Sequence, residues 1–277
     1  MSNLIQRTLS GACFITAVAG AVLWCSYACA SVFLVFMLWS LLEFYHIVGK
    51  DGVKPAKILG VVTSIVIFAS SFLYAQNLVN VRIFLVIIPL LAAIFIACIY
   101  RKEAWSFRAA VYTVGGLVYI AVPFSMLNGL AYPSLPVYGT SGGYFPDVLL
   151  GFFILLWTND TFAYLTGILL GKHRLFERIS PKKSWEGFFG GLLFTAGMAM
   201  VVARMFPVPA LHHWLVIAAL SVVFGVYGDL LESLLKRNMG MKDSGHFLPG
   251  HGGILDRFDV VLLAAPMVYA YVTWFVF

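Results

Sequence analysis

A short polar stretch near the end of this 277-residue sequence carries most of its candidate chemistry. Residues 233–259 read SLLKRNMGMKDSGHFLPGHGGILDRFD, whereas the rest of the chain is mostly apolar. The ionisable residues of this stretch are Lys236, Arg237, Lys242, Asp243, His246, His251, Asp256, Arg257 and Asp259. Ionisable groups are costly to hold near hydrocarbon, so a cluster of them in an apolar chain indicates function. Carboxylates, cations and glycines together predict phosphate and metal chemistry at a membrane surface.

Three carboxylates in or near this stretch have the spacing of metal ligands. Asp256 and Asp259 open a predicted helix at positions i and i+3, and Asp229 lies near the end of the preceding one. Together they supply the oxygen atoms that Mg²⁺ prefers. Such an ion would keep several waters and bind substrate phosphates as well.

Asp229 also belongs to a polar face of its own helix. Asp229, Glu232, Ser233 and Lys236 fall at positions i, i+3, i+4 and i+7 and therefore share one side. A simpler interpretation is a salt bridge from Glu232 to Lys236 within the helix. That pair would leave Asp229 unexplained.

The loop between these two helices is rich in glycine. Residues 242–253 read KDSGHFLPGHGG, in which four of the twelve are glycine. Glycine lets backbone N–H groups turn toward a phosphate at close range. The flanking cations favour a phosphate-binding loop, and a plain turn is the alternative.

A second polar loop, residues 179–187, reads ISPKKSWEG. We expect Ser180 to cap the following helix, with Pro181 at its first position. Lys182 and Lys183 would then lie beside a helix N-terminus, which attracts anions. The alternative is a capped helix whose lysines only set membrane topology.

One further carboxylate, Asp160, lies inside an apolar segment, LLWTNDTFAYLTG. It stands about ten residues from the end of its span, or roughly 15 Å deep at 1.5 Å per residue. A carboxylate at that depth should be neutral, paired or bound to a cation. The competing interpretation is a polar contact with Asn159 or Thr158.

Composition predicts an all-α integral membrane protein. The chain is 61% hydrophobic and only 11% charged, with a mean hydropathy of +0.93, whereas soluble domains are about 25% charged. Strands of alternating polarity, as in a membrane barrel, are absent. We expect about nine transmembrane helices, at 8–26, 29–48, 56–76, 82–100, 108–130, 147–170, 185–206, 211–235 and 257–277. They form a single membrane domain, 1–277, with the motifs in its catalytic half (147–277) and plain helices before them (8–130).

Basic residues predict the orientation. All but Arg82 and Arg204 of the 18 Lys and Arg fall at the N-terminus or in alternate loops. Cytoplasmic loops are enriched in Lys and Arg. We therefore expect a cytoplasmic N-terminus and an external C-terminus. The net charge of +6 then requires no nucleic-acid partner.

These motifs resemble the phosphatidate cytidylyltransferase family, also called CDP-diacylglycerol synthases. Residues 233–259 match its signature: Ser, two residues, Lys-Arg, four residues, Lys-Asp, then Leu-Pro-Gly-His-Gly-Gly and Asp-Arg-Phe-Asp. A match with so many fixed positions is highly specific. Residues 180–187 and 159–164 also resemble family motifs, in the expected order. The first 100 residues fit only in being hydrophobic.

The resemblance implies an in-line attack of the phosphatidate phosphate on the α-phosphorus of CTP, giving CDP-diacylglycerol and pyrophosphate. It also implies Mg²⁺, with a second cation left open, and a homodimer. The positions of the candidate groups predict an active site that faces the cytoplasm, and the compact chain is typical of a bacterial inner-membrane protein. The expected catalytic residues are Asp229, Asp256, Lys236 and Asp160. The expected metal ligands are Asp229, Asp256 and Asp259. The expected substrate contacts are Ser180, Lys182, Lys183, Ser184, Glu186, Arg237, Lys242, Asp243, His251, Gly252, Gly253 and Arg257.

Two other functions compete with this one. A CTP-dependent lipid-alcohol kinase would attack the γ-phosphorus and would need a base, for which Asp160 is a candidate. It would release CDP instead of pyrophosphate. An ion-coupled transporter would also carry intramembrane carboxylates. Against it, the polar groups gather toward one side and no inverted repeat is evident.

Overall fold

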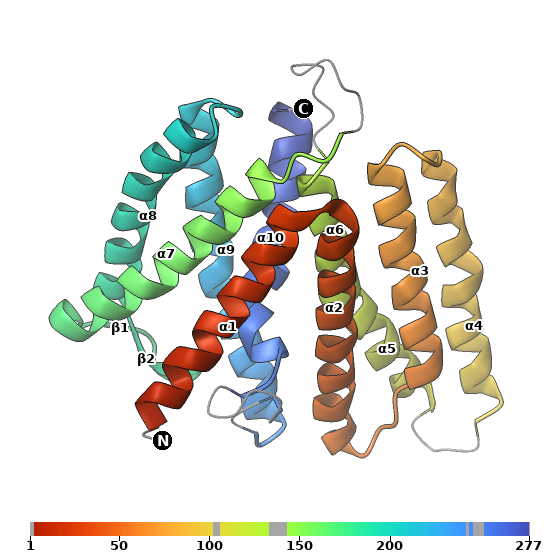
Figure 1. The fold of residues 1–277 in the computed structure, drawn as a ribbon. Coiled ribbons are helices and arrows are strands. Elements are labelled where there is room, and N and C mark those ends of the chain that lie inside the picture. Colours follow the sequence, from red (N-terminus) through yellow and green to blue (C-terminus); the bar gives the residue numbers. More distant parts are fainter. Residues whose placement is uncertain (1–2, 102–105, 133–142, 242–243, 246–251, 277) are drawn as a thin grey trace.

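The computed structural model describes residues 3–101, 106–132, 143–241, 244–245 and 252–276, with side chains from Gly11 onward. Within these ranges the chain forms one small hairpin and ten α-helices, of which α5 and α6 are continuous, so that there are nine helical segments (Figure 1). The helices are α1 (Asn3–Trp24), α2 (Ser26–Val48), α3 (Lys57–Ala75), α4 (Ile87–Ile99), α5 (Ser106–Gly116), α6 (Val122–Leu130), α7 (Asp147–Leu170), α8 (Trp185–Met205), α9 (Leu211–Asn238) and α10 (Leu255–Phe275). Short helices η1 (Gly49–Asp51) and η2 (Val81–Val86) follow α2 and precede α4. A π-helical turn, η3 (Leu117–Ala121), joins α5 and α6 into one segment.

The predicted helix ranges agree with these bounds to within a few residues. The division between the first two helices had no polar loop to mark it. It falls at Cys25, whose backbone is extended and whose Sγ accepts the N–H of Ala28 at 3.4 Å. A capping side chain of this kind starts a new helix without any loop.

Eight helices of the described chain are long and apolar enough to cross a membrane. The first, described from Gly11 to Trp24, is a shorter apolar helix. Large apolar side chains such as Leu169 and Leu193 are more than 70% exposed, as expected for surfaces that face lipid. The chain is thus a multi-span membrane protein.

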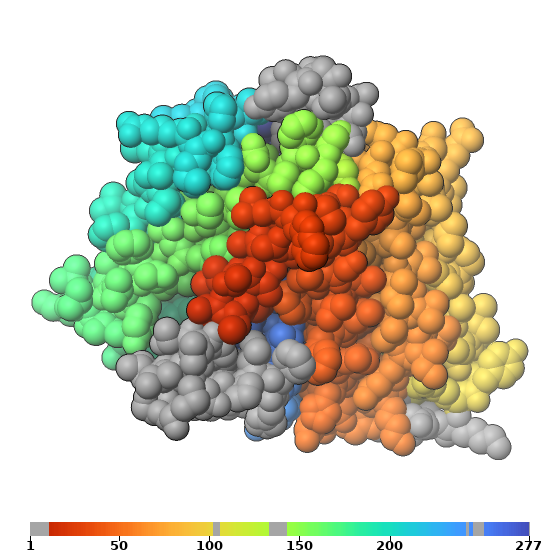
Figure 2. Space-filling view, viewed as in Figure 1, coloured from red at the N-terminus to blue at the C-terminus, as the bar shows by residue number. Residues whose placement is uncertain are grey.

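Successive helices run in opposite directions, so the two ends of the chain lie on opposite sides of the molecule (Figure 1). The C-terminal ends of α2, α4, α7 and α9 lie on the same side as the N-terminus. The side chains of residues 11–24 of α1 fill the middle of one face, between α7 and α2 (Figure 2). This arrangement gathers the connections that contain the polar motifs at one end.

Aromatic packing fixes the start of α10. The ring of Phe258 is completely buried. Around it stand Phe14, Phe33, Phe36 and Phe124, at centroid separations of 5.4, 6.4, 5.2 and 4.8 Å. Such pairs add about 0.5–1.5 kcal/mol each beyond the area they bury. Because Phe258 lies between Asp256 and Asp259 in the sequence, this packing also orients both carboxylates.

The two helices that carry the carboxylates approach closely at one glycine. A Cβ atom built on Gly228 of α9 would collide with the backbone oxygen of Asp259 on α10. Any side chain at this position would push the helices apart. The glycine therefore allows Asp229, the next residue, to lie beside α10.

The hairpin was not predicted. Strands β1 (Arg174–Phe176) and β2 (Ser180–Ser184) pair antiparallel between α7 and α8. The expected cap at Ser180 was wrong, because Ser180 and Pro181 belong to β2. The cap is Ser184, whose Oγ accepts the N–H of Gly187 at 3.1 Å. Strand pairing delays the helix by one turn and leaves Lys182 and Lys183 on a strand.

Candidate active site

Two lysines bind carboxylates of α9 and α10 and thereby join strand β2 and these two helices. Lys183 of β2 lies 2.5 Å from Asp229 of α9. Lys236 of α9 lies 2.7 Å from Glu232 and 2.6 Å from Asp256 of α10. The Glu232 side chain is fully buried, so its negative charge requires a partner at this distance. The predicted bridge from Glu232 to Lys236 is confirmed, and Lys236 extends it to a second helix.

Backbone N–H groups complete the surroundings of Asp256. Its Oδ2 accepts the N–H of Ser244 at 3.1 Å and that of Gly253 at 2.8 Å. Gly252 has a φ of +78°, which favours glycine, and a Cβ there would collide with the same oxygen. The described end of the glycine-rich loop thus turns its N–H groups toward a carboxylate at the start of α10. Whether the loop also binds phosphate stays a prediction.

Sequence reasoning missed Glu43, which lies on α2, about 200 residues away in the chain. This buried carboxylate accepts the Ser244 hydroxyl at 3.1 Å and the N–H groups of Ile254 and Leu255 at 3.1 and 2.8 Å. Glu43 therefore anchors both ends of the loop whose N–H groups hold Asp256. A single acidic residue inside an apolar helix was the only available signal.

A second group of charges lies around Asp229. Asp259 interacts electrostatically with Asp229, Glu232 and Asp160. Asp160 in turn interacts with Lys183 and Arg257. Asp160, Asp229, Glu232 and Asp259 thus lie in one electrostatic neighbourhood, which also includes Lys183 and Arg257.

Asp160 itself is exposed on α7. The alternative in which it contacts its neighbours does not hold in the described residues. Thr158 donates its hydroxyl to the carbonyl of Ile154 at 2.7 Å, and the Oδ1 of Asn159 is buried without a hydrogen-bond partner. The Asp160 carboxylate remains accessible to a ligand.

Another missed residue is Tyr119, on the π-helical turn. Its hydroxyl is buried without a hydrogen-bond partner and lies within electrostatic reach of Glu232, Asp259 and Asp229. π-Helical turns inside α-helices often occur at functional sites. An apolar sequence context gave no signal for it.

The remaining predicted contacts divide into three groups. Lys182 and Arg237 are exposed at the same end of the molecule. Ser184 caps α8, and Glu186 lies 2.6 Å from the Nδ1 of His173, so both have structural partners here. Lys242, Asp243 and His251 lie outside the described residues.

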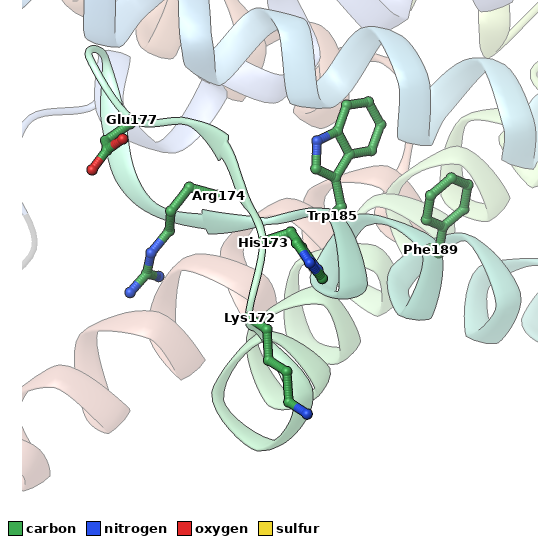
Figure 3. Close-up of a pocket in the computed structure, with 6 residues that line it drawn as sticks. All are labelled: Lys172, His173, Arg174, Glu177, Trp185 and Phe189. Atoms are coloured by element: carbon green, nitrogen blue, oxygen red, sulfur yellow. The ribbon is translucent and has the colours of Figure 1, made fainter.

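An open pocket of about 710 Å³ lies at the hairpin between α7 and α8 (Figure 3). Its lining residues are Lys172, His173, Arg174, Glu177, Trp185 and Phe189. None of them is one of the clustered carboxylates. The hairpin contributes to both the pocket and the cluster. Lys183 of β2 binds Asp229, and Trp185, which follows β2 directly, lines the pocket.

The described residues contain no group of three or more His, Cys, Asp and Glu able to hold a metal ion among themselves. Mg²⁺ commonly binds one or two carboxylates together with waters and substrate phosphates. Mg²⁺ requires oxygen ligands, which Asp229, Asp256 and Asp259 carry, and in the same cluster the Oε1 of Glu232 is buried without a hydrogen-bond partner. The donor set therefore fits an ion shared with a phosphate ligand and does not fit a closed protein site.

Comparison with known proteins agrees with the geometry. Residues 5–275 match the sequence pattern of the family described as "Cytidylyltransferase family". The phosphatidate cytidylyltransferase of Staphylococcus epidermidis is 38% identical over 189 residues, which cover 65% of this chain and 66% of that protein. The protein of the same name in Bacillus subtilis is 46% identical over 118 residues, 42% of this chain and 44% of that protein. The chain thus spans just under two thirds of the staphylococcal relative and less than half of the Bacillus one. Because the family pattern extends over almost the whole sequence, this membrane protein belongs to the cytidylyltransferase family.

Proposed function

We propose that the chain is a phosphatidate cytidylyltransferase, which converts CTP and phosphatidate to CDP-diacylglycerol and pyrophosphate. Family membership and the names of its bacterial relatives support this activity. One observation carries the assignment to a site. The network of Lys183 with Asp229, and of Lys236 with Glu232 and Asp256, joins β2, α9 and α10, which are three of the segments that hold the polar motifs.

The proposed reaction requires neutralisation of the negative charge on its substrates more than it requires a general base. The phosphate of phosphatidate is already ionised at neutral pH, so its oxygen can attack without deprotonation. The new bond forms between an oxygen of the phosphatidate phosphate and the α-phosphorus of CTP. The bond between the α-phosphorus and the oxygen that bridges to the β-phosphorus breaks, and pyrophosphate leaves with that oxygen. The obstacle is the repulsion between two anions.

The lysines of the cluster can reduce this repulsion. Lys183 and Lys236 are each held within 2.7 Å of a carboxylate. An arriving triphosphate offers each ammonium a second anionic partner, and charge-assisted hydrogen bonds to phosphate are strong. The same carboxylates keep the lysines in position before substrate binds. Lys182 and Arg237, which are exposed, add further positive charge.

Asp229, Asp256 and Asp259 are the residues that would hold Mg²⁺. When bound, the ion neutralises phosphate charge and stabilises the leaving pyrophosphate. Asp160, which is exposed near Lys183 and Arg257, would orient substrate from α7.

The proposed membrane orientation has a cytoplasmic N-terminus, an external C-terminus and an active site open to the cytoplasm of a bacterium. It is supported by the common side on which the N-terminus and the ends of α2, α4, α7 and α9 lie, since the Lys- and Arg-rich loops follow those ends (Figure 1). A single membrane domain and a homodimer are further parts of the proposal. The dimer rests on the family resemblance alone.

Product analysis tests this function directly. The purified protein is incubated with α-³²P-labelled CTP, phosphatidate and Mg²⁺, and the lipids are separated. We expect labelled CDP-diacylglycerol with one equivalent of pyrophosphate. In a parallel assay with γ-³²P-labelled CTP, release of CDP with the label found on a lipid would instead identify a kinase. No labelled lipid from a correctly inserted protein would contradict the proposal.

A further inference from the structure

The pocket on the hairpin has a rigid frame. The N–H of Trp185 donates to the carbonyl of His173 at 2.9 Å, and the His173 ring lies 2.6 Å from Glu186. Arg174 pairs with Ser184 in the two-stranded sheet. The residues from both sides of the pocket are therefore joined by backbone and side-chain bonds. A volume of about 710 Å³ is ample for the polar part of a lipid.

The pocket joins two chemically different surfaces. Lys172 and Arg174 are exposed cations on the chain that leaves α7 (Figure 3). Trp185 and Phe189 are 46% and 59% exposed on the first turns of α8, with their rings stacked at 6.0 Å. Just before the cations, the end of α7 presents further exposed apolar side chains, namely Ile168, Leu169 and Leu170. Cations beside exposed aromatic and aliphatic groups favour a ligand with an anionic head and an apolar tail.

The pocket also adjoins the proposed reaction site. Arg174 pairs with Ser184, and the residue before Ser184 is Lys183, which binds Asp229. Because successive side chains of a strand point to opposite faces, a headgroup held by Arg174 would lie across β2 from the lysine–carboxylate network, at the neighbouring strand position. A phosphomonoester carries more negative charge than the phosphodiester of other common anionic phospholipids, so the two cations of the pocket favour it.

We propose that this pocket is the docking site for the phosphatidate headgroup, with Lys172 and Arg174 on the phosphate and Trp185 and Phe189 along the start of an acyl chain. This inference rests on the proposed function and adds to it a binding site separate from that of CTP. Phosphatidate would enter from the membrane beside α8 and then move along β2 toward Lys183.

The test measures kinetics in mixed micelles with the full-length protein. In the double variant Lys172→Gln/Arg174→Gln, we expect the KM for phosphatidate to rise about fivefold, the size expected from losing exposed charge interactions. The KM for CTP should not change. Arg178→Gln is the matched control, because Arg178 is an exposed cation of the same hairpin that does not line the pocket. It should leave both constants unchanged.

Two further measurements separate the outcomes. Trp185→Ala should raise the KM for phosphatidate, and Trp185→Phe should restore it. Phosphatidylglycerol, a phosphodiester, should compete only weakly in the wild type. Equal competition by phosphatidylglycerol, an unchanged KM in the double variant, or an equal rise in both KM values would overturn the docking site. In each of these cases the wild-type protein still forms CDP-diacylglycerol, whereas failure of the proposed function would abolish that product altogether.

Discussion

The carboxylate of Glu43, on the second helix, accepts the backbone N–H of Leu255, the first residue of the last helix, at 2.8 Å. The same carboxylate accepts Ile254 N–H and the Ser244 hydroxyl. Through these bonds the N-terminal half of the protein fixes the loop that holds Asp256. The first helices are therefore part of the active-site framework and more than a membrane anchor.

Removing Glu43 should damage stability and activity together. Glu43→Ala leaves three buried donors without an acceptor, which should lower the free energy of unfolding by about 3 kcal/mol. Glu43→Gln keeps one carbonyl oxygen and should lose less. Thermal unfolding in detergent and turnover measure the two effects. Wild-type values for Glu43→Ala in both assays would show that the loop has another anchor.

Asp229→Asn and Asp256→Asn should each lower kcat by about 10²-fold or more while the protein still inserts and folds, because each removes charge that the transition state requires. Asp147→Asn is a suitable control, since Asp147 opens α7 at the opposite end of that helix from the hairpin. Turnover by purified protein measures the effect. Wild-type kcat in either variant would remove that residue from the site.

Neighbouring lysines provide a matched pair. Lys183 lies 2.5 Å from Asp229, whereas Lys182 is exposed on the same strand. Lys183→Gln should therefore lower kcat and raise the KM for CTP, by about tenfold in kcat/KM, because it also leaves Asp229 without its cation. Lys182→Gln should have a smaller effect, mainly on KM. Equal kinetics for the two variants would mean that the ion pair plays no part in turnover.

Tyr119→Phe should separate stability from activity. The Tyr119 hydroxyl is buried without a hydrogen-bond partner, so its removal should leave the melting temperature unchanged or raise it. If the hydroxyl serves a bound substrate, kcat/KM should fall about tenfold. Tyr112→Phe is the control, because the Tyr112 hydroxyl binds Asp51 and has no contact with the cluster. Unchanged kcat and KM in Tyr119→Phe would show that the hydroxyl has no role in catalysis or substrate binding.

The helices were predictable from the sequence because each crosses a membrane and must be apolar over about 20 residues. The bridge from Glu232 to Lys236 was predictable too, since residues four apart share a helix face. Both predictions depend on local sequence alone and do not require knowledge of which helices are neighbours in the fold.

Contacts between distant segments were not predictable. The approach of Glu43 to Leu255 and of Lys183 to Asp229 depends on how the helices pack, which hydropathy does not encode. The misplaced cap at Ser180 has a local cause. The Ser-Pro pair resembles a helix start, but pairing of the strands extends the chain as far as Ser184.

We propose that Asp229 and Asp256 act on one divalent ion together with a nucleotide. Anomalous diffraction from crystals grown with Mn²⁺ and CTP would locate that ion. We expect an anomalous peak within coordination distance of both carboxylates and of a phosphate oxygen, with Lys183 and Lys236 turned toward the triphosphate. A Mn²⁺ peak elsewhere, or CTP bound with both lysine–carboxylate pairs intact and no ion between them, would contradict it.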